Sequence, residues 1–322
     1  MPASSSFHRP ALLDGLVDYA GLFPPAALAL DAAAAQFVAH RAQPEAWMLG
    51  SFVLPIAQTT ALAERLPADL PTHLSVLGSG GGTPEAFLDA LDADFRALEA
   101  LEAAAPHLTA PTLEVKIPTG LPPVELRRLV EHVNSRAAAR RRFVFLEVPL
   151  SGLDDASRRT HPLDVVLEVE PGAAGVKFRT GGLVADAFPS CADLAVAIGA
   201  ALDAGVPFKC TAGLHHPVRM HRDEVGTRMH GFLNVFGGAV LRHAGGVDAM
   251  DLEAVLADED AAAWGWTDDG GLRYRNREVS AEDVRRGRRL ATGFGSCSFD
   301  EPVDDLRALG LLPADGAAAA RI

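Results

Sequence analysis

Short apolar runs that end at glycine or proline alternate along the chain with longer segments rich in alanine and leucine. The longer segments repeat their apolar residues at three- and four-residue steps, the spacing of an amphipathic helix, whereas the short runs have the length of buried strands. This alternation is typical of βαβ units. The pattern predicts eight strands, at residues 16–25, 47–55, 74–79, 113–118, 143–149, 175–182, 207–213 and 231–238.

Helices are expected between these strands, at residues 27–41, 58–66, 84–104, 122–139 and 191–204. Eight strands that alternate with helices favour an α/β fold of the (β/α)₈ TIM-barrel type, which needs about 250 residues. Two connections fit this prediction less well, because 214–230 is short for a helix and 150–174 has no clear helical pattern. An open, doubly wound sheet is therefore the alternative fold.

The pattern changes after residue 246. A helix is expected at 251–264, a small hairpin around Asp-Gly-Gly at 266–276, and a helix that starts at Ser280, where Asp283 three residues later completes a capping pattern. We expect residues 1–246 to form the (β/α)₈ barrel. Residues 247–322 are expected to form a C-terminal extension of helices and a hairpin, packed on the barrel.

The amino-acid composition limits the kinds of binding partner and the cellular compartment that we expect for this protein. A net charge of −13 argues against nucleic acid or an anionic membrane as the main partner. The first residues lack the apolar core of a secretory signal, and no stretch has the roughly 18 uninterrupted apolar residues of a membrane span. Three cysteines without a CxxC spacing indicate neither a disulfide framework nor a zinc knuckle. We expect a cytoplasmic protein without a membrane partner, and the sequence is compatible with a homo-oligomer.

The chain uses lysine sparingly. Of 29 basic residues only Lys116, Lys177 and Lys209 are lysines. Each lies in a short apolar or β-branched run that ends at proline or glycine: LEVKIPTG, GVKFRTGG and PFKCTAGLHHP. An amine can lose its proton, whereas a guanidinium cannot. The pattern therefore indicates lysine chemistry, with the alternative that each lysine only reaches solvent from a strand end.

Polar residues at the carboxyl ends of the strands are the first place to look for a site, because the loops after the strands form the active face of such barrels. In chain order these residues are Asp18, Tyr19, Ser51, Ser79, Glu114, Lys116, Glu147, Lys177, Arg179, Lys209, Thr211, His215, His216 and Asn234. Side chains alternate along a strand and neighbouring strands lie about 4.8 Å apart. We therefore expect Lys116, Glu147, Lys177 and Lys209 to converge on one cavity.

Converging cations have a chemical consequence. A like charge nearby, together with partial burial, lowers the pKa of a lysine towards about 7 to 8, and a neutral amine can attack a carbonyl to form a Schiff base. We expect Lys177 to be the nucleophile and Lys209 to lower its pKa and relay protons. Glu147 is expected to act as acid or base, or else as a counter-ion of Lys177 or Lys116.

Two of these segments resemble a known family. VKFRTGG on the sixth expected strand and FKCTAGL on the seventh are similar to the V-K-x-x-T-G and K-x-x-x-G motifs of class I aldolase barrels of the deoxyribose-phosphate aldolase type. The resemblance implies a Schiff-base role for Lys177 and a proton-relay role for Lys209. It spans about 15 residues. The family has an aspartate as the acidic partner on strand four, where this chain offers Glu114 and an additional Lys116.

An anionic group on the substrate would need local donors. Barrels often bind phosphate at the loops after strands seven and eight, through glycine amides and a helix N-terminus. Gly237 and Gly238 precede an expected helix, and Arg179 or Arg219 supplies charge. The alternative for the glycines is a tight turn. We expect a small phosphorylated or carboxylated substrate, with Thr211, Asn234 and Glu114 among the residues that bind it.

Histidines and cysteines add further candidates. His215 and His216 lie in a histidine-rich segment, but consecutive residues of an extended chain point in opposite directions and no HExxH pattern is present. We predict no metal and no cofactor, and expect one of this pair to transfer protons or to bind substrate. Cys297 lies between two serines, and no histidine partner can be assigned to it from the sequence, so thiol catalysis is not expected.

The sequence thus predicts a lyase, of aldolase type, that acts on a small anionic carbonyl compound through a lysine Schiff base. The first alternative is a barrel enzyme whose lysines and Arg179 only bind anions, as in phosphoribosyl transfer or decarboxylation. The second is a non-catalytic metabolite-binding protein, because a fold alone does not fix a function.

Overall fold

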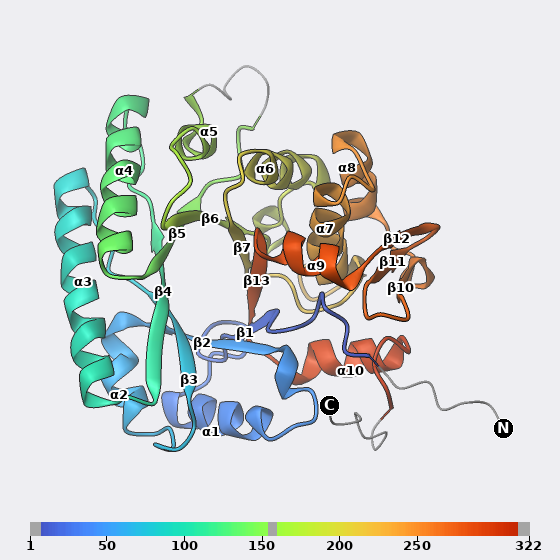
Figure 1. The fold of residues 1–322 in the computed structure, drawn as a ribbon, viewed down its shortest axis with the longest axis horizontal. Coiled ribbons are helices and arrows are strands. Elements are labelled where there is room, and N and C mark those ends of the chain that lie inside the picture. Colours follow the sequence, from blue (N-terminus) through green and yellow to red (C-terminus); the bar gives the residue numbers. More distant parts are fainter. Residues whose placement is uncertain (1–7, 154–159, 315–322) are drawn as a thin grey trace.

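The computed structural model describes residues 8–153 and 160–314, which form a closed barrel of parallel strands surrounded by helices (Figure 1). The strands follow one another around the barrel in the order β1-β13-β7-β6-β5-β4-β3-β2. They are β1 (Val17–Tyr19), β2 (Leu49–Pro55), β3 (Thr72–Leu77), β4 (Leu108–Lys116), β5 (Phe143–Val148), β6 (Ala174–Arg179), β7 (Phe208–Thr211) and β13 (Ala291–Ser296). The predicted (β/α)₈ barrel is confirmed, and the open sheet is excluded.

The outer layer consists of helices that follow the strands. They are α1 (Leu30–Arg41), α2 (Thr59–Ala63), α3 (Pro84–Ala104), α4 (Pro123–Ala139), α5 (Pro162–Leu167), α6 (Cys191–Asp203), α7 (Gly238–His243), α8 (Ala249–Ala257), α9 (Ala281–Arg288) and α10 (Asp300–Ala308). The five helices predicted between the strands correspond to α1, α2, α3, α4 and α6. Two of them, α3 and α6, have side-chain caps, since Thr83 and Ser190 each accept a hydrogen bond from a backbone amide of the first turn.

The register of the strands brings the predicted lysines to one level of the barrel. Lys116 on β4 pairs with Glu147 on β5, Glu147 pairs with Lys177 on β6, and Lys177 pairs with Lys209 on β7. Residues paired in a parallel ladder point to the same face of the sheet. The four residues therefore form one row across four neighbouring strands, in which the side chains of Lys177 and Lys209 are buried and that of Lys116 is exposed at the end of its strand.

The eighth strand is not where the sequence pattern predicts it. Residues 231–238 are helical, comprising the π-helix η5 (Leu233–Gly237) and the start of α7. Every side chain of η5 is buried, and Phe236 stacks on Phe208 and Phe294 of the barrel wall. A short, uniformly apolar run is compatible with either a buried strand or a buried helix, and here the helix forms. The prediction of a strand at 231–238 is wrong.

The barrel is closed instead by β13, which pairs with β1 and β7. Its sequence ATGFGS has weak strand propensity, but Gly293 and Gly295 lie beside Lys209 and Thr211 on the inner face, while Phe294 points outward against Phe232. The glycines leave room inside the barrel, and the phenylalanine anchors the strand to the helical layer. The barrel consequently extends past residue 246, which corrects the predicted boundary between barrel and extension.

Other parts of the predicted extension form with different bounds, since the helix expected at 251–264 ends at Ala257 and the expected hairpin is a three-stranded sheet. Helix α8 is followed by a small antiparallel sheet of β10 (Trp264–Trp266), β11 (Leu272–Tyr274) and β12 (Arg277–Val279). Ser280 caps α9 by accepting a hydrogen bond from the amide of Asp283 at 3.2 Å. A two-stranded hairpin of β8 (Met220–Arg222) and β9 (Thr227–Met229) fills the connection after β7.

One helical stretch, residues 185–203, is long and apolar enough to match a membrane span by length and composition. It ends in α6, which packs against α5, α7 and α8 in the outer layer, so the match is weak evidence for a span.

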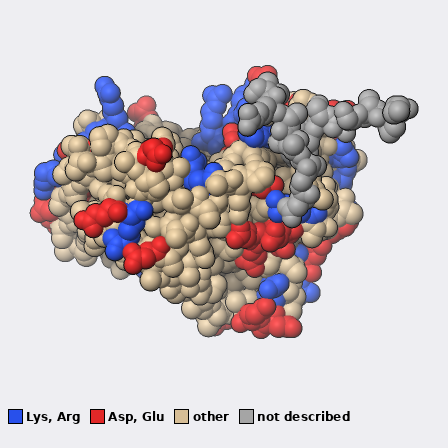
Figure 2. All heavy atoms as spheres, turned by 90° about the horizontal axis from the view of Figure 1, so that it is seen from below, with Lys and Arg blue, Asp and Glu red and all other residues tan. Residues whose placement is uncertain are grey.

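Figure 2 shows the face at the bottom of Figure 1, where acidic and basic side chains are scattered among uncharged ones, without a broad basic area outside the part covered by grey atoms.

Candidate active site

A cavity of about 220 Å³ opens at the carboxyl ends of the barrel strands. Its floor contains Glu114, Glu147, Lys177 and Lys209, and its rim contains loop residues that follow β1, β6, β7 and β13. We call it the C-terminal cavity. Parallel barrels carry their chemistry at this end, because the loops after the strands can vary while the strands stay fixed.

Lys177 is held by two carboxylates on the neighbouring strands. Its Nζ lies 3.0 Å from Oε2 of Glu114 and 2.8 Å from Oε2 of Glu147. The Lys177 and Glu114 side chains are both buried, with 4% and 3% of their surface exposed, whereas 22% of the Glu147 side chain is exposed towards the cavity. Lys177 thus has one buried partner and one partner within reach of an incoming molecule.

Lys209 is held more tightly. Its Nζ lies 2.6 Å from Oε1 of Glu114 and 2.7 Å from Oδ2 of Asp18, and it donates to Oγ of Ser75 at 3.1 Å. The Ser75 hydroxyl in turn donates to Oε1 of Glu114 at 2.6 Å. Glu114 therefore bridges both amines, one with each carboxylate oxygen. We call Asp18, Ser75, Glu114, Glu147, Lys177 and Lys209 the lysine network.

The electrostatics of this network differ from the sequence-based expectation. Burial alone would lower the pKa of Lys177, but the carboxylates of Glu114 and Glu147 outweigh it and raise the pKa above its ordinary value. The pKa of Lys209 is likewise raised, because Asp18 and Glu114 outweigh burial. Burial would raise the pKa of Glu114, yet the two ammonium groups lower it well below its usual range. The predicted lowering of the Lys177 pKa by Lys209 is wrong, since the carboxylates outnumber the amines.

Lys116 does not join the lysine network. Its side chain is exposed at the end of β4 and lines a neighbouring cavity of about 630 Å³, which it shares with Glu147 and Arg179. Lys177 and Lys209 share the C-terminal cavity as predicted, and Lys116 lies outside it. Being the last residue of its strand, Lys116 projects past the barrel rim, whereas the other two amines come from the interior.

Arg179 and Thr211 stand at the rim of the C-terminal cavity, two residues beyond the lysines on β6 and β7. Arg179 is exposed, and no acidic side chain pairs with it among residues 8–153 and 160–314. Thr211 is half-buried and pairs in register with both Arg179 and Gly295. The rim therefore offers one unpaired cation and one hydroxyl above the lysine network.

The threonine and glycines of the two lysine motifs join the loops after β6 and β7. The Thr180 hydroxyl donates to the carbonyl oxygen of Ala212 at 2.6 Å. A side chain at Gly181 would come within 2.8 Å of the Cα atom of Gly213, so only glycine permits this approach. Gly213 also has a φ of 74°, in the left-handed region that favours glycine. These contacts fix the two loops relative to one another above Lys177 and Lys209.

The two consecutive histidines have different environments. His215 lines the C-terminal cavity, where its Nδ1 lies 3.1 Å from Oε2 of Glu301 and 4.0 Å from Sγ of Cys297. Burial alone would lower the pKa of His215, but the hydrogen bonds to Cys297 and Glu301 raise it to about 9. His216 is buried outside this cavity, with Nδ1 at 2.5 Å from Oδ2 of Asp305. His216 anchors helix α10, and its predicted role in substrate binding is not supported.

Three further predicted binding residues are structural. The Asn234 side chain is fully buried, with Oδ1 accepting from the amide of Arg219 and Nδ2 donating to the carbonyl oxygens of Val255 and Asp258, each at 2.8 Å. Gly237 and Gly238 are buried inside the helical segment. A side chain at Gly237 would meet Trp264, and one at Gly238 would meet Leu252. The predicted anion site at these glycines is wrong, because the run is a packed helix rather than a loop.

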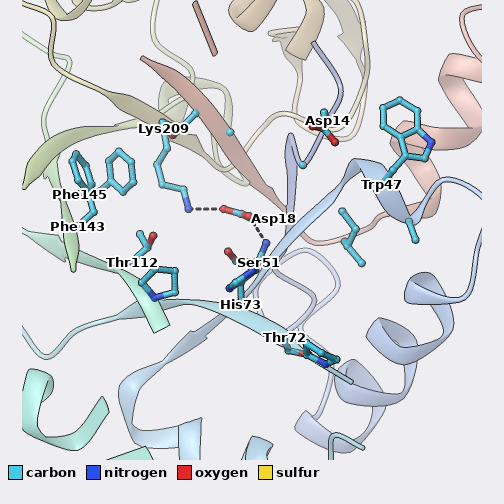
Figure 3. Close-up of a pocket in the computed structure, with 18 of the residues that line it drawn as sticks. Asp14, Asp18, Trp47, Ser51, Thr72, His73, Thr112, Phe143, Phe145 and Lys209 are labelled. Carbon is cyan, nitrogen blue, oxygen red and sulfur yellow. Dashed lines mark hydrogen bonds and ion pairs between the residues drawn. The ribbon is translucent and has the colours of Figure 1, made fainter. Parts of the chain in front are cut away.

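Asp18 and Ser75 are members of the lysine network that the sequence analysis did not assign to the site. Both lie on short strands, β1 and β3, at positions directed inward. Asp18 also accepts a hydrogen bond from the backbone amide of Ser51 at 2.6 Å through Oδ1, which fixes its orientation towards Lys209 (Figure 3). An acidic residue within an apolar strand was the signal for Asp18, but a single serine in β3 gave none.

A second cavity of about 930 Å³ lies at the amino ends of the strands. Figure 3 shows Lys209 and Asp18 among its lining residues, between Phe143 and Phe145 on one side and Asp14 and Trp47 on the other. We call it the N-terminal cavity. In the part of the chain that the structure describes, no group of three or more histidine, cysteine, aspartate or glutamate side chains is arranged to hold a metal ion.

Fold and site together define a (β/α)₈ barrel with two buried lysines at the base of its C-terminal cavity. A solved structure of deoxyribose phosphate aldolase from Aeropyrum pernix is similar, with a TM-score of 0.53 and 14% sequence identity over 94% of each chain. That aldolase is described as tetrameric. No family model matches this chain, and no curated protein sequence matches it. The resemblance to aldolase-type barrels predicted from the lysine motifs is thereby confirmed as a likeness of fold.

Proposed function

We propose that this protein is a carbon–carbon lyase of aldolase type, in which Lys177 forms a Schiff base with a small anionic carbonyl compound. The observation that carries the proposal is the lysine network: two buried amines share the carboxylate of Glu114 at the base of the C-terminal cavity. Buried charges of this kind are costly to maintain, and they are common at catalytic sites.

Lys177 is the better nucleophile of the two. Lys209 is bound by Asp18, Glu114 and Ser75, all buried or half-buried, and has no partner facing the cavity opening. Lys177 has Glu147 as a partner, whose carboxylate is partly exposed to the cavity. A proton can leave Lys177 for Glu147 over 2.8 Å when a substrate displaces water from the cavity.

The raised pKa of Lys177 means that the resting amine is protonated, so the reaction starts with this transfer. The neutral amine then adds to the carbonyl carbon, and the new hydroxyl group takes the proton back from Glu147 and leaves as water, giving an iminium ion. The bond between the α and β carbons then breaks: the Glu147 carboxylate takes the proton of the β-hydroxyl group, whose oxygen becomes the carbonyl of the departing aldehyde, and the electron pair of the broken bond forms an enamine on Lys177. Lys209 is placed to protonate the enamine, with Glu114 and Asp18 holding its charge.

The charge balance argues against a purely anion-binding role for the lysines. Three carboxylates, from Asp18, Glu114 and Glu147, surround the two ammonium groups. The lysine network therefore carries no excess positive charge with which to attract an anion. Arg179, at the rim, is the residue we propose for the phosphate or carboxylate of the substrate, together with the Thr211 hydroxyl.

Borohydride reduction tests the Schiff base directly. The protein is incubated with a panel of small aldehydes and ketones that carry a carboxylate or phosphate, and separately with uncharged acetone, then reduced and analysed by peptide mass spectrometry. We expect a reduced adduct on Lys177 in the native protein and none on that residue in Lys177→Arg, which keeps the charge but cannot form the imine. Arg179→Ala is expected to weaken trapping of anionic carbonyls more than that of acetone. A panel that gives no adduct on Lys177 would contradict the proposal.

We further propose that the enzyme works in the cytoplasm as a homo-oligomer. The tetrameric state of the structurally similar aldolase supports the second part. Light scattering coupled to size-exclusion chromatography measures the mass directly, and a mass equal to one chain of 33.8 kDa would contradict it.

A further inference from the structure

A thiol and an imidazole line the C-terminal cavity apart from the lysine network, and a carboxylate lies against the imidazole. Cys297 is the first residue after β13, His215 belongs to the loop after β7, and Glu301 lies in the first turn of α10. Strands β7 and β13 are neighbours in the barrel, which brings Cys297 and His215 together although 82 positions separate them in the chain. Both side chains line the cavity that contains Lys177.

The contacts give His215 the role of a charged donor. Its Nδ1 faces Oε2 of Glu301 at 3.1 Å and Sγ of Cys297 at 4.0 Å, so one N–H group serves both acceptors. Glu301 is itself held in place, because its amide donates to the Ser298 hydroxyl at 3.2 Å. An imidazolium beside a thiol stabilises the thiolate, which is the nucleophilic form.

We propose that Cys297 and His215 form a second covalent site in the C-terminal cavity, at which the thiol adds reversibly to the carbonyl carbon of a small aldehyde. The Cys297 sulfur forms a bond to the carbonyl carbon while the carbonyl π bond breaks, and the proton on His215 Nδ1 moves to the oxygen. The product is a hemithioacetal, and the reverse step regenerates thiolate, imidazolium and aldehyde. No oxidant or further reactant is needed.

The thiol site lies in the same cavity as Lys177, the lysine proposed to form the Schiff base. The sulfur and the Lys177 amine open into one cavity of about 220 Å³, which is the size of a small metabolite. An aldehyde held on Cys297 therefore waits beside the amine that we propose as the nucleophile. The thiol site itself depends only on Cys297, His215 and Glu301, so it can be tested in a protein that lacks Lys177.

The chain contains its own controls for thiol reactivity. Cys191 is half-buried on α6, and Cys210 is fully buried in the wall of β7. Burial raises the pKa of both thiols. Under native conditions at neutral pH, we expect limiting iodoacetamide to alkylate Cys297 at least tenfold faster than Cys191, with Cys210 unreacted. Faster alkylation of Cys191 than of Cys297 would overturn the proposal.

A substitution separates activation by His215 from mere accessibility. His215→Gln is expected to slow alkylation of Cys297 about tenfold and to leave the rate at Cys191 unchanged, which also shows that the variant is folded. Glu301→Gln keeps a neutral partner for His215 and is expected to slow the reaction less. An unchanged rate at Cys297 in His215→Gln would contradict the assigned role of the histidine.

The aldehyde is tested in Lys177→Met, so that an imine on that lysine cannot contribute. We expect ¹³C-labelled glyoxylate to give the carbon signal of a hemithioacetal with this variant, and the signal to disappear in Lys177→Met/Cys297→Ser. Absence of the signal in the single variant would refute the thiol site while leaving borohydride trapping on native Lys177 untouched. Conversely, a hemithioacetal without any Lys177 trapping would uphold this site and refute the Schiff-base proposal.

Discussion

The two ends of the barrel differ in a way that volume alone does not reveal. The N-terminal cavity is the larger, about 930 Å³ against about 220 Å³, but its rim consists of exposed side chains such as Arg41 and Arg289 and of the half-buried Trp47. The C-terminal cavity is smaller, and its floor is a set of buried charges that share partners. A catalytic site is therefore recognised by buried charged groups that contact one another below an opening, rather than by the volume of the cavity.

Lys209 belongs to both ends. Its side chain lines each cavity. Asp18, which lines the N-terminal cavity, holds it on one side (Figure 3), and Glu114, which lines the C-terminal cavity, holds it on the other. The loops at the C-terminal end also distinguish the two ends of the barrel. At the C-terminal end, Thr180 and the paired glycines of the lysine motifs join neighbouring loops, so the groups around the opening are fixed in place.

Among variants that test the difference between the two ends, Glu114→Gln is expected to have the largest effect, a loss of stability. This change removes the charge that both amines share and leaves buried ammonium groups with fewer partners, which typically costs about 3 kcal/mol or more in unfolding free energy. Urea denaturation measures the loss. Asp14→Asn in the N-terminal cavity is the matched control and should change stability by less than about 0.5 kcal/mol, because Asp14 is exposed. Equal losses in the two variants would erase the distinction between the ends.

The pH dependence of stability is the next largest effect. The pKa of His215 is raised to about 9, so its interactions with Cys297 and Glu301 stabilise the fold fully below about pH 6.5 and are lost as the pH rises through 9. We expect the free energy of unfolding to fall by on the order of 2 kcal/mol over this interval. His215→Gln should remove that slope. His73→Gln, at the exposed rim of the N-terminal cavity, should retain it, and an identical slope in all three proteins would contradict the assignment.

Thr180→Val should have a smaller effect. The substitution removes the hydroxyl that bonds the Ala212 carbonyl and leaves a buried acceptor without that donor, which costs about 1 to 2 kcal/mol. Thermal denaturation reports the loss, and weaker borohydride trapping reports loosening of the loops above Lys177. Thr112→Val, in the wall of the N-terminal cavity, is the isosteric control and should change neither measurement. Normal trapping with unchanged melting in Thr180→Val would mean that the threonine does not hold the loops.

The smallest effect is expected from Arg41→Ala and Arg289→Ala. Both residues are exposed at the rim of the N-terminal cavity, so each change should alter stability by less than about 0.5 kcal/mol and leave trapping on Lys177 unchanged. Loss of trapping in either variant would show that the N-terminal cavity takes part in the reaction.

Much of the fold was predictable because strong local patterns agree with the final structure. The second to seventh strands and five of the helices form within about five residues of their predicted positions, whereas β1 ends at Tyr19, six residues before its predicted end. The failure at the eighth strand has a physical cause, since 231–238 is apolar on every side and suits a buried helix, while the real strand at 291–296 is half glycine and threonine. Its place is decided by Phe294 and by the gap between β1 and β7, neither of which is a local property.

The residues of the candidate site could be predicted from the sequence, but the balance of positive and negative charge around the lysines could not. Lys177, Lys209 and Glu147 stood out because they end apolar strands, and they do share one cavity. Whether a lysine pKa rises or falls depends on how many carboxylates reach it, and Asp18 arrives from a strand about 190 positions away from Lys209. The two lysine motifs identify the amines, whereas the carboxylates that bind them lie on distant strands and meet the lysines only in the folded barrel.

Closure of the barrel by β13 also has a consequence for synthesis. During translation, β1 emerges first and the strand that must seal it to β7 emerges last, after residue 291. Until then both borders of the curved sheet expose unpaired backbone groups, which favour association with other chains. A chain ending at residue 246 would keep these borders permanently, so expression of that fragment should yield aggregates, not a soluble domain, and ribosome-bound chains should become protease-resistant only near completion.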